Sequence, residues 1–282
     1  MTDLNLIQEA KTFLNHLNAS ARKKLGQNFM VREDELSFIA EAVGIQAGES
    51  VLEIGPGLGF LTRFLLEKKA HVLGVEKDRL YARFLKDYFN GYSFQLTEND
   101  ILKVDLEEDL QVTKPIKVVG NIPFNITSPL LEWLIQNRSL VITAVLTTQW
   151  EVAERLAAKP GTKSWGTLSI FLQLYADVTF LRKIGRSSFY PSPRVDSAVI
   201  RIQFLKEPRF SISDEENFFK LVRRAFQKRR KTILNALSDE TNQKLSKTSL
   251  LNTLQQSDID AIRRPETLTI AEWVKLHNNL AD

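Results

Sequence analysis

The stretch VLEIGPGLGFLT, residues 51–62, decides the fold. Its first four residues predict a short apolar strand, and the residues from Phe60 onward have apolar side chains at helical spacing. Between them, Gly55, Gly57 and Gly59 permit a sharp turn and let a ligand approach the main chain. The free N–H groups of the following helix point to the same spot, so the pattern predicts a nucleotide-like cofactor over the carboxyl edge of a parallel sheet.

The spacing of these glycines separates two classes of cofactor. The dinucleotide fingerprint is G-x-G-x-x-G, but here the third glycine comes one position early and Phe60 stands in the expected place. The form E-x-G-x-G-x-G resembles the first motif of the S-adenosylmethionine-dependent methyltransferases. The alternative is a glycine-rich turn that binds no ligand, and the related motifs that follow in the chain disfavour it.

Composition narrows the classes of function. A chain of 282 residues with 43% apolar and 26% charged residues suggests one large globular domain, alone or with a small appendage. No stretch of apolar residues is long enough to span a membrane, and the amino terminus lacks a signal pattern, which predicts a cytoplasmic protein without a membrane partner. The absence of cysteine excludes disulfides and iron–sulfur clusters. Because the three histidines lack ligand spacing, we expect no metal.

Two acids follow the next predicted strands. HVLGVE ends in Glu76, about 20 residues beyond Gly55, where nucleotide-binding α/β folds place a carboxylate that accepts both ribose hydroxyl hydrogens. The next strand, in SFQLTENDIL, leads to Asp100 and Ile101. In the methyltransferase pattern, this acid accepts from the adenine amino group and the apolar neighbour packs on the ring.

The fourth strand, KVVG, runs directly into Asn121-Ile122-Pro123-Phe124, the most specific signal in the chain. It resembles the N/D-P-P-Y/F motif of enzymes that methylate exocyclic amino groups of nucleic-acid bases. Adenine N6 is a poor nucleophile, so its amino hydrogens must be held while the lone pair turns toward the methyl group. The Asn121 side-chain oxygen and the Ile122 carbonyl are suitable acceptors because Pro123 stiffens the turn. Phe124 offers a face on which an extruded base can stack.

The remaining pattern completes an α/β domain and adds a helical one. TAVLTTQ, DVTFLRKI and DSAVIRIQF predict three more strands, and the loop GRSSFYPSPRV between the last two should stand on the same edge as Asn121. Beyond about Lys206 only helices are predicted. A short amphipathic helix is expected within residues 1–20, and sequence gives it no function.

Basic residues gather in three places. The longest cluster lies in a predicted helix from Glu215 to Leu237, where one face is apolar and another carries a stripe of cations. A solvated face usually mixes signs, so this stripe favours phosphate binding, with pairing to Glu215 and Glu216 as the alternative. The candidate RNA-binding residues are Arg22, Lys23, Lys24, Arg194, Lys220, Arg223, Arg224, Lys228 and Lys231.

Seven ordered motifs together resemble the ribosomal RNA small-subunit adenine dimethyltransferase family, associated with kasugamycin sensitivity. They are KKLGQNF, EIGPGLGFLT, GNIPFNITSPLL, QWEVAERLAAKPG, FYPSPRVDSAV, FQKRRKTILNAL and RPETLT, which run from about Arg22 to Trp273. The resemblance implies a Rossmann-like, seven-stranded class I methyltransferase domain over residues 1–205, with residues 1–21 as an extra segment. A small all-helical RNA-binding domain would follow over residues 206–282.

The resemblance also implies an activity and a set of site residues. Members of the family transfer four methyl groups from S-adenosylmethionine to N6 of two adjacent adenines near the 3′ end of small-subunit ribosomal RNA. We therefore expect a monomer that acts on a pre-assembled small subunit during ribosome biogenesis. By this resemblance, the catalytic residues are Asn121, Ile122, Pro123 and Phe124. The cofactor-binding residues that it implies are Asn28, Met30, Gly55, Gly57, Glu76, Asp100, Ile101 and Asn121.

Two other functions remain open at this stage. A large-subunit adenine methyltransferase of the macrolide-resistance type shares the NIPF core, although FYPSPRVDSAV and FQKRRKT favour the small-subunit family. A non-catalytic ribosome-assembly factor on the same fold would carry a damaged glycine loop or a damaged Asn121 motif. Both motifs are intact here.

Overall fold

The computed structural model describes residues 5–18, 28–123, 126–238 and 246–281. The chain divides into two compact units. The first contains Met1–Ala153 and Asp177–Lys206, and the second contains Glu154–Ala176 and Glu207–Asp282. The segment between the fifth and sixth strands of the large sheet thus groups with the carboxy-terminal helices, which sequence periodicity did not indicate.

The first unit is built on a seven-stranded sheet with the order β4-β3-β2-β5-β6-β9-β7. The pairs β4–β3, β3–β2, β2–β5 and β5–β6 are parallel, and β9 lies antiparallel to β6. All seven predicted strands are therefore present. Their bounds are β2 Ser50–Ile54, β3 His71–Glu76, β4 Phe94–Glu98, β5 Ile116–Asn121, β6 Val141–Gln149, β7 Ala176–Ile184 and β9 Ser197–Phe204.

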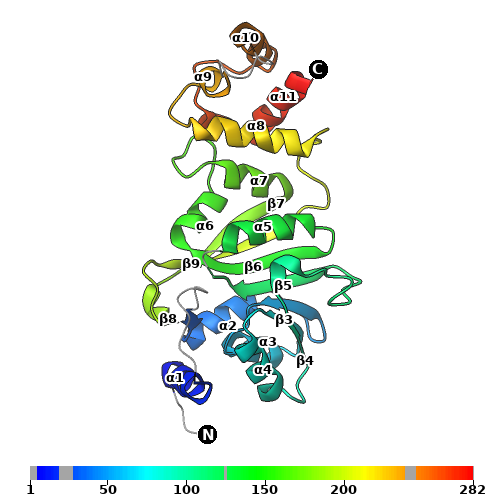
Figure 1. Cartoon of the computed structure of the whole chain (residues 1–282), viewed down its shortest axis with the longest axis vertical. Coiled ribbons are helices and arrows are strands. Elements are labelled where there is room, and N and C mark those ends of the chain that lie inside the picture. The colour runs from blue at the N-terminus through cyan, green and yellow to red at the C-terminus, as the bar shows by residue number, and fades with distance from the viewer. Residues whose placement is uncertain (1–4, 19–27, 124–125, 239–245, 282) are drawn as a thin grey trace. The chain divides into compact units, whose positions relative to one another are not determined.

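Helices flank this sheet because its central strands are apolar on both faces. Val51, Val118 and Val145 have no exposed surface, as expected for parallel strands covered from two sides. Figure 1 shows α2, α3 and α4 beside strands β3 and β4 of the sheet. The helices of this unit and of its boundary are α1 Leu6–His16, α2 Glu33–Ala42, α3 Phe60–Glu67, α4 Arg79–Tyr88, α5 Thr127–Gln136 and α6 Trp150–Leu156.

The glycine loop between β2 and α3 has the backbone that the sequence predicts. Gly55, Gly57 and Gly59 have φ values of +65°, +59° and +78°. A Cβ at Gly59 would also lie 2.6 Å from a ring carbon of Phe89, so both conformation and space require glycine there. The loop therefore ends directly at the amino terminus of α3, a place where the N–H groups of the first helical turn have no carbonyl partner within the helix.

Helix α1 packs on this α3 region. Its buried residues Leu6, Ala10 and Leu14 belong to the same hydrophobic cluster as Phe60. Glu9 forms a bidentate ion pair with Arg63, with Arg63 Nη1 3.0 Å from Glu9 Oε2. The amphipathic helix expected within residues 1–20 is thus an integral part of the first unit.

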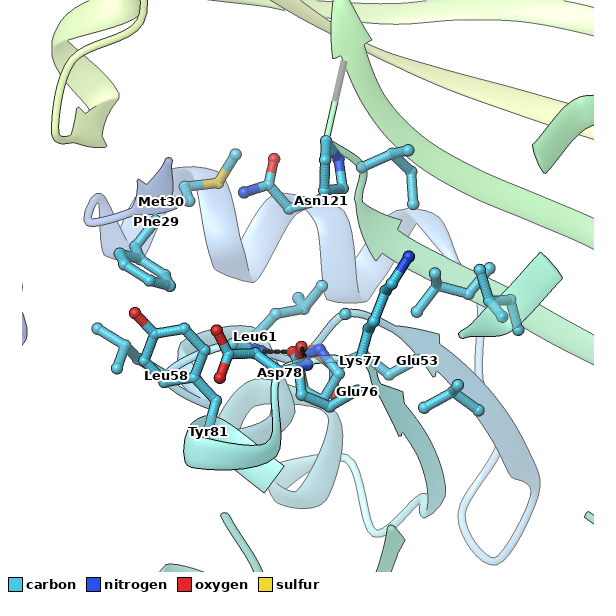
Figure 2. A pocket seen from close by; sticks show the side chains of 18 of the residues that line it. Phe29, Met30, Glu53, Leu58, Leu61, Glu76, Lys77, Asp78, Tyr81 and Asn121 are labelled. Atoms are coloured by element: carbon cyan, nitrogen blue, oxygen red, sulfur yellow. Dashed lines mark hydrogen bonds between the residues drawn. The ribbon is translucent and has the colours of Figure 1, made fainter. Parts of the chain in front are cut away.

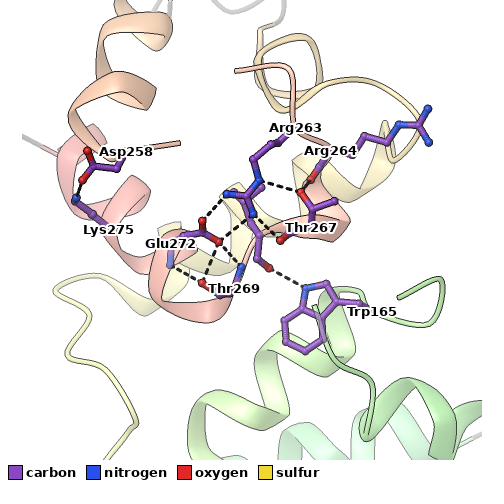
Figure 3. A network of polar contacts seen from close by, with 9 residues as sticks. Trp165, Asp258, Arg263, Arg264, Thr267, Thr269, Glu272 and Lys275 are labelled. Atoms are coloured by element: carbon purple, nitrogen blue, oxygen red, sulfur yellow. Dashed lines mark hydrogen bonds and ion pairs between the residues drawn. The ribbon is translucent and has the colours of Figure 1, made fainter. Parts of the chain in front are cut away.

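The second unit consists of α7 Thr167–Tyr175, α8 Glu215–Gln227, α9 Ile233–Leu237, α10 Lys247–Gln256 and α11 Ile270–Ala281. Aromatic rings of α7 and α8 meet in its core, where the Phe171 and Phe219 ring centroids are 4.0 Å apart. The indole nitrogen of Trp165 donates to the carbonyl of Leu268 at 3.0 Å, which ties the segment before α7 to the segment before α11 (Figure 3).

The prediction of one continuous helix from Glu215 to Leu237 is wrong. Helix α8 ends at Gln227, and a turn of residues 228–232 precedes α9. Thr232 caps α9 by accepting from Asn235 N, and Ile233 N donates to the carbonyl of Arg263 instead of continuing the α8 ladder. Lys228 and Lys231 consequently lie on a turn and do not extend the face of α8 that carries Lys220, Arg223 and Arg224.

Two short strands also lie outside the expectations from sequence. Phe29–Met30 (β1) and Phe189–Tyr190 (β8) pair antiparallel and bring the start of the FYPSPR loop to the segment that follows Asn28. Within the described residues, no helix is long and apolar enough to cross a membrane.

Candidate functional site

A single pocket at the carboxyl edge of the sheet collects residues from most of the predicted motifs. It is lined by the ends of β2, β3 and β5, the loop after β4, and the β1–β8 pair. Among the predicted site residues, those that line it are Asn28, Met30, Gly55, Gly57, Glu76, Asp100, Ile101, Asn121, Ile122 and Pro123. In Figure 2, Asn121 and Met30 lie on one side of the pocket, and Glu76 and Asp78 lie on the other.

Glu76 is fixed at the end of β3 by two main-chain donors. Its Oε2 accepts from Gly57 N at 3.0 Å and its Oε1 accepts from Asp78 N at 2.8 Å. The side chain is only 7% exposed, and burial raises its pKa although both N–H groups act in the opposite direction. Each carboxylate oxygen retains acceptor capacity beyond its main-chain bond, so the glycine loop is tied to an acid that can still receive ligand hydroxyls.

Glu53, the acid that precedes the glycines, is also buried at this pocket. It is 1% exposed and accepts from Thr62 Oγ1 at 2.7 Å. Burial raises the pKa of Glu53 to about 8; the Thr62 hydrogen bond opposes this rise and the nearby Glu76 charge adds to it. At neutral pH this carboxyl group is therefore mainly protonated.

Asp100 lies across from Lys77. Lys77 Nζ donates to Asp100 Oδ2 at 2.6 Å, and Leu102 N donates to Oδ1 at 3.2 Å. Burial alone would raise the pKa of Asp100, but these hydrogen bonds outweigh it and hold the pKa below its ordinary value. Asp100 is thus a fixed anion beside Ile101, which is 4% exposed and supplies an apolar wall.

Asn121 is the polar side chain at the end of β5. Its Nδ2 donates to the carbonyl of Asn28 at 2.8 Å, which leaves Oδ1 as the acceptor of that amide. Ile122 N donates to Thr147 O at 3.1 Å and anchors the turn to β6. Phe124, the predicted stacking residue, lies outside the described residues.

Sequence reasoning missed several residues of this pocket. Phe29, Lys77, Asp78, Tyr81 and Phe189 all line it. Phe189 could have been found, because the FYPSPR loop was expected on the edge of Asn121, and that expectation is confirmed. Lys77 and Tyr81 gave no signal, since a lysine after a strand and a tyrosine in an amphipathic helix are ordinary surface or packing residues.

The predicted basic residues do not gather at this pocket. Arg194, Lys220, Arg223, Lys228 and Lys231 are exposed, and Arg224 is half-buried. Arg22, Lys23 and Lys24 lie outside the described residues. Over the described part of the chain, no group of three or more histidine, cysteine or acidic side chains could hold a metal ion.

The residues of the pocket suit a nucleoside-bearing cofactor. Glycines with positive φ keep side chains out of the loop so that a ligand can approach the main chain, Glu76 offers acceptors for vicinal hydroxyls, and apolar walls at Ile101 and Leu58 can enclose a base. Together with the mixed seven-stranded sheet, this site defines a Rossmann-like methyltransferase of the class I type.

The chain belongs to the ribosomal RNA adenine dimethylase family, whose model matches residues 18–276. The ribosomal RNA small subunit methyltransferase A of Alkaliphilus oremlandii is 40% identical over 263 residues, with 92% of this chain and 91% of that protein covered. The protein of the same name from Prosthecochloris aestuarii is 42% identical over 271 residues, with 96% and 98% covered.

Two solved structures extend this comparison. A dimethyladenosine transferase from Plasmodium falciparum has a TM-score of 0.74 and 28% identity, with 87% of this chain and 94% of that chain covered. The 23S rRNA methyltransferase ErmE has a TM-score of 0.69 and 26% identity, with 90% and 100% covered.

Proposed function

We propose that this chain dimethylates N6 of two adjacent adenines near the 3′ end of small-subunit ribosomal RNA, with S-adenosylmethionine as the methyl donor. It is an rRNA adenine dimethyltransferase by family and by the names of its relatives. The observation that carries the proposal is the orientation of Asn121, whose Nδ2 is bound to Asn28 so that Oδ1 is left for the substrate at a pocket that also contains Glu76 and the glycine loop.

The residues around the pocket would hold the donor as follows. Glu76 accepts from ribose hydroxyls, Gly55 and Gly57 permit close approach of the main chain, and Asp100 with Ile101 receives the adenine. Asn28 and Met30 complete the wall beside Asn121. When bound, S-adenosylmethionine supplies an electrophilic methyl group.

The chain contributes to catalysis mainly by holding the target amino group. Asn121 Oδ1 and the Ile122 carbonyl accept its hydrogens, which frees the nitrogen lone pair to face the methyl group. Phe189 and Phe124 are the aromatic candidates for the face of the extruded base. Since an alkylated amino group readily loses a proton to water, no general base is assigned.

The RNA-binding surface of the second unit is better supported by three loops than by the face of α8. On α8, Lys220 pairs with Glu216 at 2.5 Å, and the Arg223 guanidinium lies 5.0 Å from the Phe171 ring centroid. These side chains already have partners within the unit. Because Glu216 offsets the charge of Lys220, the net positive charge of the helix face is smaller than its cations alone suggest, whereas Arg223 keeps its charge over the ring.

Hydrogen bonds bring together loops 159–165, 228–232 and 260–267. Gly161 N donates to Glu266 O at 2.8 Å, Arg229 bonds both Glu266 and the carbonyl of Lys163, and Ile233 N donates to Arg263 O at 2.6 Å. Their exposed cations form what we call the three-loop surface: Lys159, Lys163, Lys228, Arg230, Lys231 and Arg264.

Figure 3 shows that the two arginines of loop 260–267 differ in their contacts. Arg263 is bound by Glu272 and Thr267, whereas the side chain of Arg264 points away from that network. Glu266, the acid nearest to these cations in sequence, pairs with Arg229. The three loops carry six exposed cations and one exposed acid, Asp260, and such an excess of positive charge suits a phosphate backbone.

We further propose that the enzyme acts as a cytoplasmic monomer on a partly assembled small subunit. The alternative function is methylation of large-subunit RNA, which we consider because the chain is similar to the 23S rRNA methyltransferase ErmE. Incubation with labelled S-adenosylmethionine and each unmethylated subunit, followed by nucleoside analysis, decides between them. We expect N6,N6-dimethyladenosine in the small subunit; label confined to the large subunit, or found in neither, would refute the proposal.

A further inference from the structure

The carboxyl edge of the sheet has a second half that the pocket does not use. The pocket takes the ends of β2, β3 and β5 and the loop after β4, while β6, β9 and β7 continue the sheet beyond β5. If the donor fills the pocket, a strand of RNA whose adenine reaches Asn121 can continue over the β6–β7 half of this edge. The side chains there are therefore candidates for contacts with neighbouring nucleotides.

An aromatic pair stands at this half of the edge. Trp150 is the first residue of α6 and follows β6 directly, and Phe180 lies on β7. Their ring centroids are 5.1 Å apart at 77°, and Lys183 Nζ lies 4.8 Å from the Trp150 ring centroid. Phe180 is 38% exposed, although an aromatic ring in a sheet is normally buried, and Val195, which precedes Asp196 in the chain, is 44% exposed.

Asp196 holds this group of residues in place. Its main-chain oxygen accepts from Trp150 N at 3.0 Å, and its carboxylate accepts from Lys183 Nζ at 3.1 Å and from Arg186 N at 3.2 Å. The end of β6, the end of β7 and the FYPSPR loop are thus joined at one residue. Arg186 and Arg194 are also exposed, so this edge carries three cations beside the paired Asp196 and the exposed Glu151.

The spacing from the catalytic turn suits a neighbouring nucleotide. Asn121 is paired with Thr147 on β6, and Trp150 lies three residues further along the chain. At 3.3 Å per residue this corresponds to roughly 10 Å. Aromatic faces beside cations are how proteins bind single-stranded nucleic acid without reading its sequence.

We propose that Trp150, Phe180 and Lys183 form a stacking site for a nucleotide next to the target adenine in single-stranded RNA. The inference rests on the proposed function and adds a substrate contact to it. The aromatic rings would hold a neighbouring base, and Lys183 would lie near the phosphate that links it to the target. Such a site would position the RNA strand while Asn121 acts on the extruded adenine.

Binding to unmethylated small subunits tests the site. Phe180→Ser and Trp150→Leu should each raise the Kd for the subunit about fivefold to tenfold, and Lys183→Gln about twofold to threefold. Affinity for S-adenosylmethionine should stay within a factor of two. Tyr92→Ser is the matched control, because Tyr92 is 63% exposed beside β4 at the opposite edge of the sheet, and it should bind like the parent.

Tryptophan fluorescence gives a second readout that does not depend on activity. Trp133, Trp165 and Trp273 are 6%, 1% and 0% exposed, so quenching by a stacked base should come from Trp150. A protein-free, adenine-containing single-stranded oligonucleotide should quench the parent, and Trp150→Phe should remove the quenching.

Two results would overturn the inference. One is subunit binding by Phe180→Ser and Trp150→Leu that equals the parent's, together with no quenching. The other is weaker binding to the subunit but unchanged binding to protein-free RNA, which would mean that the aromatic pair contacts a protein of the subunit. Failure of the proposed function is a separate result, since the parent itself would then leave small subunits unmethylated.

Discussion

The pocket in the first unit and the three-loop surface in the second hold their polar groups in different ways. In the pocket, Glu76 is fixed by Gly57 N and Asn121 by Asn28 O, which are main-chain atoms next to strand ends. On the three-loop surface, half-buried pairs such as Arg229–Glu266 fix the loops, while the exposed cations extend from them. Single substitutions should therefore have large effects in the pocket and small, additive ones on the surface.

The largest expected effect is that of Asn121→Ala. Its acceptor is needed most when the amino group turns toward the methyl group, so the single-turnover rate should fall by about 10²–10³. Rates measured at saturating cofactor and RNA check this. A rate within a factor of three of the parent's would place Asn121 outside catalysis and would remove the main contrast between the two regions.

Glu76→Ala should act on cofactor binding instead. It removes a carboxylate that receives the ribose and leaves Gly57 N and Asp78 N without their acceptor, so affinity for S-adenosylmethionine should fall by roughly 2–4 kcal/mol. Calorimetric titration measures this, with Glu76→Gln as the comparison because it keeps one oxygen for the main chain. RNA binding should be nearly unchanged, and equal cofactor affinity in all three proteins would contradict the assignment.

The salt dependence of RNA binding should follow the number of cations that the three-loop surface presents to phosphates. Replacing Lys228, Arg230, Lys231 and Arg264 by glutamine should reduce the slope of log affinity against log salt by about 3–4, at roughly 0.7–0.9 per phosphate. The matched variant replaces Lys220, Arg223 and Arg224 on α8 and should reduce the slope by less than about 1. If the α8 variant shows the larger change, the helix face is the RNA-binding surface, as expected from sequence.

The smallest effect concerns Glu53 and pH. Because burial raises its pKa to about 8 from an ordinary 4.5, the stability contributed by its neutral form is complete below pH 4.5 and is lost as the pH rises through 8. The side chain in Glu53→Gln cannot ionise. The difference in Tm between this variant and the parent should therefore increase by roughly 2–8 °C from pH 6 to pH 8.5, which corresponds to about 1–2 kcal/mol in the free energy of unfolding. Thermal unfolding without cofactor measures the difference, and a constant offset would show that Glu53 is ionised when folded.

The fold was predictable where short-range patterns determine it. Apolar runs ending in glycine, glutamate or asparagine mark the carboxyl ends of parallel strands, and parallel strands bring those ends to one edge. The residues expected at Gly55, Glu76, Asp100 and Asn121 therefore line one pocket. Their predicted roles remain proposals.

Contacts between distant segments could not be predicted in the same way. Strands β1 and β8 have two residues each, too few to produce a period, and only their pairing places Phe189 at the pocket. The break after Gln227 depends on Arg263, a residue far along the chain that accepts from Ile233 N. Helical spacing continues through Lys231, so periodicity alone extends the helix too far.

The docking of α1 has a consequence for how the chain can be handled. Phe13 lies against three rings of the first unit, 6.2 Å from Phe60, 4.9 Å from Phe84 and 5.4 Å from Tyr88. A shortened chain that begins at Asn28 would present those rings to water as one apolar patch and leave Arg63 without Glu9. Such a truncation should self-associate, so expression designs that trim the amino terminus as a dispensable tail would sacrifice colloidal stability.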